Sequence, residues 1–161
     1  MHLFVLRHGE TQEGYNEKER PLTQFGERQA HYAGYFLKRL DVFPDVILSS
    51  PLVRAQRTAE IVRGILGVRE VITTEYLIPG SDYRKLIEQL NLMQGKNPLL
   101  VGHEPHLSEF IAQLIGGIDF RRIEMRKGYL AGLNIPLPIV RGTATLILLV
   151  NPIELKIGDF E

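Results

Sequence analysis

The sequence of 161 residues contains no cysteine. Disulfide frameworks, thiolate nucleophiles and cysteine-based zinc or iron–sulfur sites are therefore excluded. A charge excess of either sign is also absent, because 19 Lys and Arg residues balance 19 Asp and Glu residues. Non-specific nucleic-acid binding normally requires a basic excess, so this class of function is disfavoured.

Long apolar segments are missing as well. The longest apolar run covers residues 144–150, is interrupted by Thr145, and is far shorter than the ~20 residues that span a bilayer. The first residues, MHLFVLRHGET, lack the cationic segment and apolar core of a secretory signal. We therefore expect a cytoplasmic protein with no membrane partner.

The overall composition is that of an ordinary soluble globule, with 44% hydrophobic and 24% charged residues. The chain has no internal repeat, low-complexity tract or linker. We therefore expect residues 1–161 to form a single domain, with residues from Asn151 onward as a surface tail or a short edge segment.

Short apolar runs alternate with helical periodicity along the chain. The runs at residues 3–6, 46–48 and 99–101 are continuous, as in parallel strands buried on both faces. Between and beyond them, apolar residues recur at helical spacing; these predict helices around residues 33–40, 52–66, 83–90 and 107–114.

Residues 129–135 and 143–150 predict two further strands that pair antiparallel at one edge of the sheet. The sequence thus predicts a three-layer α/β/α sandwich with a mostly parallel sheet and an antiparallel edge strand.

Chemically active side chains follow the predicted strands where ligands of open α/β sheets bind, beyond the carboxyl ends. Arg7, His8 and Gly9 follow the first strand, Arg54 comes shortly after the second, and His103 follows the strand at residues 99–101. We therefore expect two histidines and two arginines at one edge of the sheet.

The surroundings of Arg54 indicate an anion. Ser50 and Pro51 predict the N-cap and first residue of a helix, which places Arg54 near the positive end of the helix dipole. A cation is favourable there if an anion lies beside it, and guanidinium groups suit phosphate oxygens. A neutral imidazole can attack phosphorus, so the cluster predicts phosphoryl transfer without a metal or other cofactor.

Three segments carry a family resemblance: LRHGET at Leu6–Thr11, SSPLVRAQRTAE at Ser49–Glu60 and VGHEP at Val101–Pro105. They resemble the histidine phosphatase superfamily, which includes the phosphoglycerate mutases and acid phosphatases. The RPLT segment at Arg20–Thr23 and the short chain are most similar to SixA-type phosphohistidine phosphatases. The turn at residues 78–82 and the KG-x-L-A segment at residues 127–131 extend this similarity.

The resemblance implies a role for each matching residue. His8 would be the phosphorylated nucleophile, Arg7 and Arg54 would bind the phosphoryl oxygens, and His103 would complete the pocket. Arg20, with Glu17 nearby, would lie at the mouth and orient the substrate, and Gly9 and Asp82 are further candidates for substrate binding.

The substrate and the proton donor stay open at this point. A phosphohistidine-bearing protein, with a histidine-containing phosphotransfer domain as the natural candidate, and a small phosphate ester both fit the residues. A phosphoglycerate mutase and a non-catalytic phosphohistidine-binding adaptor are further alternatives. Glu75 and Asp82 are the candidates for a general acid, and Asp82 is equally suited to be a helix N-cap.

Two other patterns have simpler interpretations. His103 and His106 are spaced like metal ligands, but no third ligand lies nearby in the sequence, so we expect no metal. The basic cluster of Arg121, Arg122, Arg126 and Lys127 is typical of a solvated face, and could alternatively dock an acidic protein.

Overall fold

The computed structural model describes residues 1–93 and 95–157. Within this part of the chain six strands form one sheet, in the order β3-β2-β4-β1-β5-β6. Their bounds are β1 His2–Arg7, β2 Val46–Ser49, β3 Val71–Thr73, β4 Pro98–Gly102, β5 Leu130–Asn134 and β6 Thr145–Val150. Strands β1 to β4 run parallel, while β5 pairs antiparallel with both β1 and β6. The predicted mostly parallel sheet with an antiparallel edge is confirmed.

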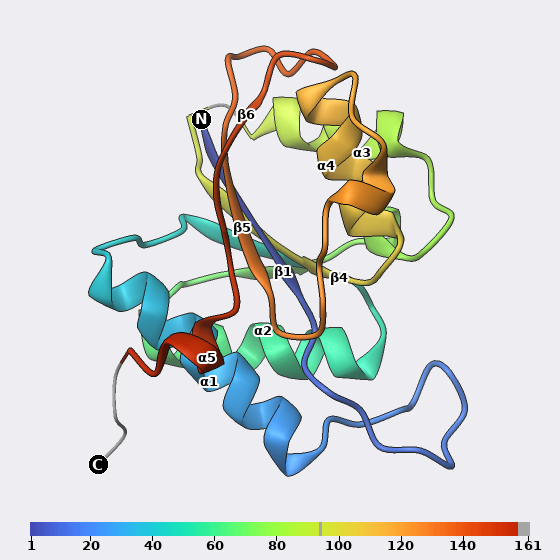
Figure 1. Cartoon of the computed structure of the whole chain (residues 1–161), viewed down its shortest axis with the longest axis vertical. Helices are drawn as coiled ribbons and strands as arrows, with labels where there is room; N and C mark the ends of the chain where they lie inside the picture. Colours follow the sequence, from blue (N-terminus) through green and yellow to red (C-terminus); the bar gives the residue numbers. More distant parts are fainter. Residues whose placement is uncertain (94, 158–161) are drawn as a thin grey trace.

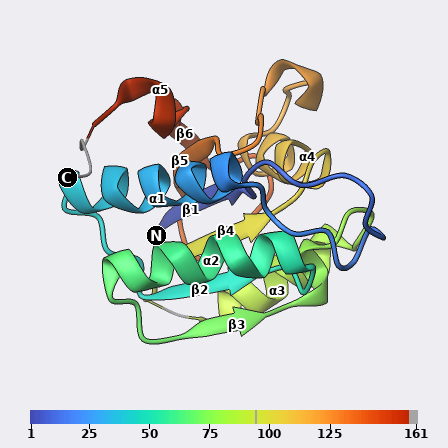
Figure 2. The same ribbon diagram turned by 90° about the horizontal axis from the view of Figure 1, so that it is seen from below.

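Helices cover both faces of this sheet. Figures 1 and 2 show α1 (Gln24–Arg39) and α2 (Val53–Leu66) side by side on one face, with α3 (Tyr83–Leu92) and α4 (His106–Ile115) on the other. The described residues also contain the short helix α5 (Pro152–Leu155) and the 3₁₀ turns η1 (Glu75–Leu77) and η2 (Phe120–Arg122). The three-layer architecture is therefore that predicted from the alternating pattern.

The continuous apolar run of β1 is explained by burial on both faces. Leu3 and Val5 pack in the cluster that contains α3 and α4, whereas Phe4 and Leu6 pack against α1 and α2. Since successive strand residues point to opposite faces, a strand between two helical layers needs apolar residues at every position.

Local sequence signals set the helix boundaries. The Thr23 hydroxyl accepts a 2.9 Å hydrogen bond from the Gly26 amide and caps α1, and Gly67 ends α2 in the left-handed conformation with φ 68°. Helix α2 begins at Val53, three residues after the predicted N-cap Ser50, because Leu52 has the extended backbone of the N-cap. Arg54 still lies in the first turn of this helix.

The carboxyl-terminal segment was predicted as a surface tail or edge segment. It contains the single turn of α5, and residues 158–161 lie outside the described part of the chain.

A close backbone approach fixes the loop that leaves β1. A Cβ atom added to Gly9 would lie 2.3 Å from the Gly26 carbonyl oxygen, and one added to Gly26 would lie 2.1 Å from the Glu10 carbonyl oxygen. Only glycine permits this contact between the loop and the first turn of α1. The loop is therefore held directly beside the carboxyl end of β1.

Candidate active site

The structure brings together the four side chains that follow β1, β2 and β4. Arg7 is the last residue of β1, His8 follows it, Arg54 lies in the first turn of α2, and His103 follows β4. The rings of His8 and His103 lie 5.0 Å apart, centroid to centroid, and are tilted by 53°. The sheet fixes their separation, because the His8 amide donates a 3.1 Å hydrogen bond to the Gly102 carbonyl.

The hydrogen bonds of His8 define its tautomer. Nδ1 lies 2.7 Å from the Gly9 carbonyl oxygen, which can only accept, so Nδ1 carries the proton. Nε2 is then the unprotonated nitrogen, and it accepts a hydrogen bond of 3.3 Å from Nε of Arg54. The lone pair of His8 Nε2 therefore faces a guanidinium group.

Burial keeps both histidines neutral. His8 is 4% exposed and His103 is 2% exposed. Burial lowers the pKa of His8 to about 2, and the neighbouring charges of Arg54 and Arg7 act in the same direction. Burial and the same two arginines lower the pKa of His103 to about 3. Two neutral imidazoles beside two cations form an environment suited to a ligand that brings its own negative charge.

Arg54 is 5% exposed and makes three hydrogen bonds beyond its own helix. Its Nε donates to His8, its Nη1 donates to the Glu17 carbonyl at 2.5 Å, and its Nη2 donates to the Glu17 carboxylate at 2.6 Å. The other Glu17 oxygen accepts a 2.9 Å hydrogen bond from Arg20. The predicted mouth residues Glu17 and Arg20 are thus joined to the cluster through Arg54.

Two buried nitrogen atoms of the four clustered side chains have no protein hydrogen-bond partner among the described residues. These are Nε of Arg7 and Nδ1 of His103. The other contacts of these side chains are a 3.0 Å bond from Arg7 Nη1 to the Met125 carbonyl and a 2.7 Å contact between His103 Nε2 and the Ser50 hydroxyl. Because buried polar atoms are normally paired, the two free nitrogens are suited to bind a ligand.

Neither Asp82 nor Glu75 forms a hydrogen bond with this cluster in the part of the chain that the structure describes. The Asp82 carboxylate caps α3 by accepting a 2.9 Å hydrogen bond from the Arg84 amide, and it pairs with the Arg84 guanidinium. Glu75 lies in η1, where its carbonyl accepts a hydrogen bond from Ser81. In residues 1–93 and 95–157, no carboxyl group forms a hydrogen bond with His8 or His103. A substrate contact by Asp82 therefore stays a prediction.

Sequence reasoning did not identify Thr58, which supports both strand-end segments. Its hydroxyl accepts a 3.2 Å hydrogen bond from the Gly9 amide and donates a 2.8 Å bond to the Arg54 carbonyl. The signal was present in the sequence, since Thr58 is a polar residue one turn after Arg54 on the buried face of α2. Gly9 has a structural reason to be glycine in its contact with Gly26, and its substrate contact stays a prediction.

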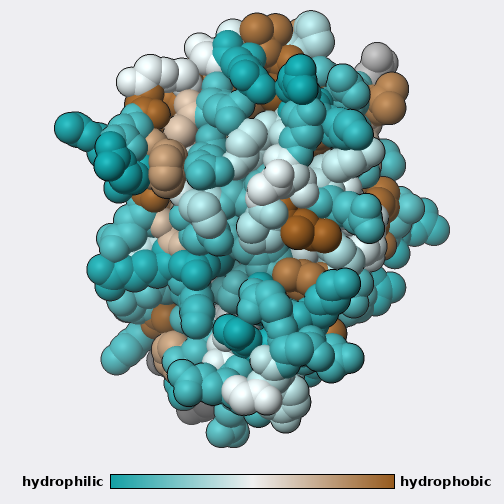
Figure 3. Space-filling view, turned by 90° about the vertical axis from the view of Figure 1, so that its right-hand side faces the viewer, coloured by the Kyte–Doolittle hydropathy of each residue, from teal (hydrophilic) through white to brown (hydrophobic). Residues whose placement is uncertain are grey.

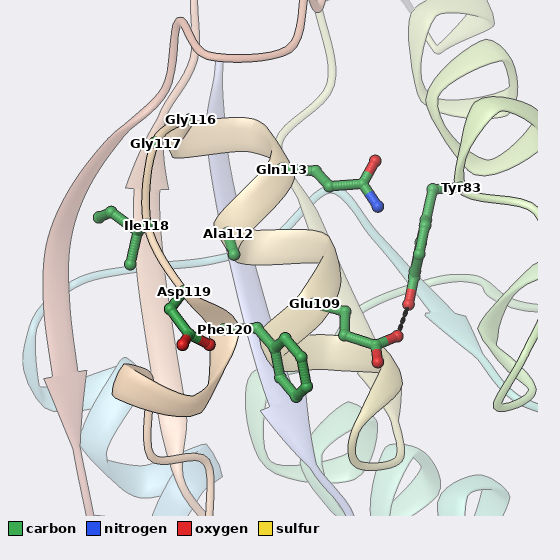
Figure 4. Close-up of a pocket in the computed structure, with 9 residues that line it drawn as sticks. All are labelled: Tyr83, Glu109, Ala112, Gln113, Gly116, Gly117, Ile118, Asp119 and Phe120. Carbon is green, nitrogen blue, oxygen red and sulfur yellow. Dashed lines mark hydrogen bonds between the residues drawn. The ribbon is translucent and has the colours of Figure 1, made fainter.

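His106 and the hollow beside α4 do not belong to the four-residue cluster. Among the described residues, no three His, Asp or Glu side chains gather where they could hold a metal ion. The ring of His106 stacks against the ring of Tyr83, and its Nε2 forms a hydrogen bond with the Tyr76 carbonyl oxygen. Figure 4 shows a separate hollow beside α4, where Tyr83 bonds Glu109; none of the four clustered residues lines it.

The surface in Figure 3 is mostly hydrophilic, with small separate apolar patches. In the part of the chain that the structure describes, no helix is both long and apolar enough to cross a membrane.

Comparisons with known proteins find similar sequences and structures. Residues 3–78 match a sequence model described as the histidine phosphatase superfamily, branch 1, and this range includes His8 and Arg54. A phosphohistidine phosphatase SixA homolog from Haemophilus influenzae is 33% identical over 128 residues, which cover 72% of this chain and 78% of that protein.

Solved structures share the fold. The protein histidine phosphatase SixA complexed with tungstate superposes with a TM-score of 0.88 at 24% identity, covering 97% of this chain and 100% of that one. The alpha-ribazole phosphatase from Shigella flexneri gives a TM-score of 0.74 at 24% identity, with 92% and 96% covered.

Proposed function

The chain belongs to the histidine phosphatase superfamily, and from that premise we propose that it removes the phosphoryl group from phosphohistidine on a protein, through a phosphorylated His8 and without a metal. The observation that carries this proposal is the state of His8. Its imidazole is buried and neutral, with Nε2 unprotonated and facing the guanidinium of Arg54.

In the first step, Nε2 of His8 attacks phosphorus. A bond forms between Nε2 and phosphorus while the bond from phosphorus to the leaving group breaks, and the electron pair of that bond goes to the leaving group. In the second step, water attacks phosphorus, the bond to His8 breaks, and inorganic phosphate is released. Covalent catalysis of this kind divides one displacement into two easier ones.

The cations beside His8 stabilise the charge of the transferring group. Arg54 and Arg7 supply N–H donors to its oxygens, and the free Nδ1 of His103 supplies a further contact when it carries a proton. These donors supply the charge compensation that a divalent cation provides in other phosphoryl-transfer enzymes. We therefore propose that activity requires no metal.

The leaving group decides the substrate class. A phosphate ester leaves as an alkoxide, which needs a carboxylic acid or another donor, whereas a phosphohistidine imidazole can carry a proton before it leaves. Within the described residues, Glu17 is the carboxylate in hydrogen-bond contact with the four-residue cluster, and both its oxygens bind arginines. Because both oxygens of Glu17 bind arginines, Glu17 is not available to protonate an alkoxide, and this supports a phosphohistidine substrate.

The surroundings of Arg7 support a protein as the carrier. Two grooves, of about 560 Å³ and about 440 Å³, are both lined by Arg7 and Arg126. Arg121 lines the first groove and Lys127 lines the second. The border is mixed in charge, because glutamates also line both grooves and Arg126 is paired with Glu124. We propose that it receives the surface of a protein around the phosphohistidine, such as that of a histidine-containing phosphotransfer domain.

The test compares the wild-type protein with the His8→Ala variant in a chelator. Each is offered a phosphohistidine-bearing phosphotransfer protein and a panel of small phosphate esters. The proposal predicts that wild type acts faster on the phosphoprotein and that His8→Ala acts on neither. Rapid turnover of one ester without turnover of the phosphoprotein would keep the nucleophile and refute the substrate. Binding without turnover by the wild type would indicate an adaptor.

A further inference from the structure

Glu17 lies in the loop between β1 and α1, and its side chain is 65% exposed. An exposed ion pair usually contributes little, because solvent screens it and the side chains lose mobility. Here, however, one partner is Arg54, whose side chain is only 6% exposed. The ion pair therefore links an exposed side chain of the loop to a buried side chain of the active site.

The buried guanidinium of Arg54 needs a counter-charge and hydrogen-bond acceptors. Glu17 supplies both, with its carbonyl oxygen 2.5 Å from Nη1 and its carboxylate 2.6 Å from Nη2. Among the described residues, Glu17 is the carboxylate that bonds Arg54. Two acceptors of one residue thus hold both terminal nitrogens of the guanidinium.

These two contacts determine the direction in which the third guanidinium nitrogen, Nε, points. With Nη1 and Nη2 both held by Glu17, the planar group presents Nε to Nε2 of His8 at 3.3 Å. We propose that Glu17 is a positioning residue that fixes Arg54 in the orientation required for phosphoryl transfer at His8. The proposal rests on the roles proposed above for Arg54 and His8.

Glu17 can hold Arg54 without blocking a substrate. A guanidinium carries five N–H groups. The three contacts to His8 and Glu17 use one each from Nε, Nη1 and Nη2. One N–H on each terminal nitrogen is left for phosphoryl oxygens. The same arginine can therefore be anchored by the loop and bind the transferring group.

Arg20 belongs to the same hydrogen-bond network as Glu17 and Arg54. It donates a 2.9 Å hydrogen bond to the second carboxylate oxygen of Glu17, so both oxygens are held, one by each arginine. Arg20 then acts on Arg54 through Glu17. This differs from the direct substrate contact that the family resemblance implies for Arg20 and Glu17, and the two roles have different kinetic consequences.

The main variants are Glu17→Ala, which removes both carboxylate contacts, and Glu17→Gln, which keeps one acceptor and loses the charge. Glu19→Gln is the matched control, because Glu19 lies in the same loop and bonds Asn16 rather than an active-site arginine. Three readouts are used: kcat/KM with a phosphohistidine protein, kcat/KM with p-nitrophenyl phosphate, and the inhibition constant of tungstate.

Positioning of Arg54 acts on the phosphoryl group, which all substrates share. We expect Glu17→Ala to lower kcat/KM about 10-fold, equal to about 1.4 kcal/mol, by the same factor for the protein and the ester. Tungstate inhibition weakens in parallel, Glu17→Gln shows a smaller loss, and Glu19→Gln matches wild type. A loss confined to the protein substrate, or no loss, would overturn the proposal.

Two further measurements separate positioning from a general structural effect. The ¹⁵N–¹H signal of Arg54 Nε should be protected from exchange in wild type and in Glu19→Gln, and exchange faster in Glu17→Ala. In a double-mutant cycle, Arg20→Ala should lower activity several-fold alone and add nothing to Glu17→Ala. Additive losses would show that Arg20 acts independently of Glu17.

These readouts also separate this proposal from the proposed function. If the phosphohistidine protein is not hydrolysed but the ester is, the ester and tungstate still report on Arg54. If neither is hydrolysed, tungstate binding and the exchange of the Arg54 Nε proton decide whether Glu17 holds the guanidinium.

Discussion

The buried neutral histidines make the stability of the folded protein depend on pH in a calculable way. Burial lowers the pKa of His8 from 6.5 to about 2 and that of His103 from 6.5 to about 3. The unfolded chain binds protons at these histidines below pH 6.5, whereas the folded protein does not. Their contribution to stability is therefore complete above pH 6.5 and is lost as the pH falls below it.

The magnitude follows from proton linkage. Each of these histidines has a normal pKa in the unfolded chain and a strongly lowered pKa in the folded protein. When the pH falls from about 7.5 to about 5.5, such a histidine lowers the unfolding free energy by about 1.4 kcal/mol. His8 and His103 together cost about 2.8 kcal/mol over this interval. The variants His8→Gln and His103→Gln each remove one such contribution. When the pH is lowered over this interval, the unfolding free energy of each variant should therefore decrease by about 1.4 kcal/mol less than that of wild type decreases.

Urea unfolding at the two pH values measures this difference, in buffers free of phosphate, because an anion bound to the folded state would add stability of its own. Leu90→Ala is the control, because it destabilises the core without removing a titratable group. We expect Leu90→Ala to show the wild-type dependence on pH. If His8→Gln also showed the wild-type dependence, the conclusion that His8 is buried in the neutral form would be wrong.

Three further predictions concern packing, the second histidine and metal. Gly26→Ala should destabilise the fold by about 1–3 kcal/mol in urea unfolding, because its Cβ would lie 2.1 Å from the Glu10 carbonyl oxygen, whereas Gly64→Ala, with nothing within 4 Å, should be neutral or stabilising. Ser50→Ala should lower kcat/KM about 10-fold, because it removes the hydroxyl 2.7 Å from His103; unchanged kinetics would contradict this. Dialysis against a chelator should leave turnover unchanged, and a loss restored by a divalent cation would refute metal independence.

The core of the site was predictable because two local signals coincide. The apolar runs before Arg7 and His103 identify buried parallel strands, and the carboxyl ends of such strands meet at one edge of a sheet. The helix signal around Ser50 was displaced by a few residues, yet it placed Arg54 in the first turn. Periodicity and strand direction were therefore sufficient to gather these side chains.

The less regular parts could not be predicted in the same way. The partnership of Glu17 with Arg54 depends on the path of an irregular loop, which no periodicity encodes. Strand β3 is only three residues long and lies at the edge of the sheet, so its apolar pattern is too short to be distinctive. In the sequence, Asp82 is compatible both with a helix N-cap and with a site residue. The fold shows that it is the N-cap of α3.

The most direct test of the mechanism is to trap the enzyme during turnover of a phosphohistidine protein and locate the phosphoryl group. The sample is quenched in alkali, because a phosphohistidine survives alkali and is lost in acid, and the modified residue is identified by mass spectrometry. We predict a phosphoryl group on His8 in wild type and none in His8→Asn, which should also be inactive. Turnover in His8→Asn, or a trapped phosphoryl group on another residue such as His103, would contradict the account.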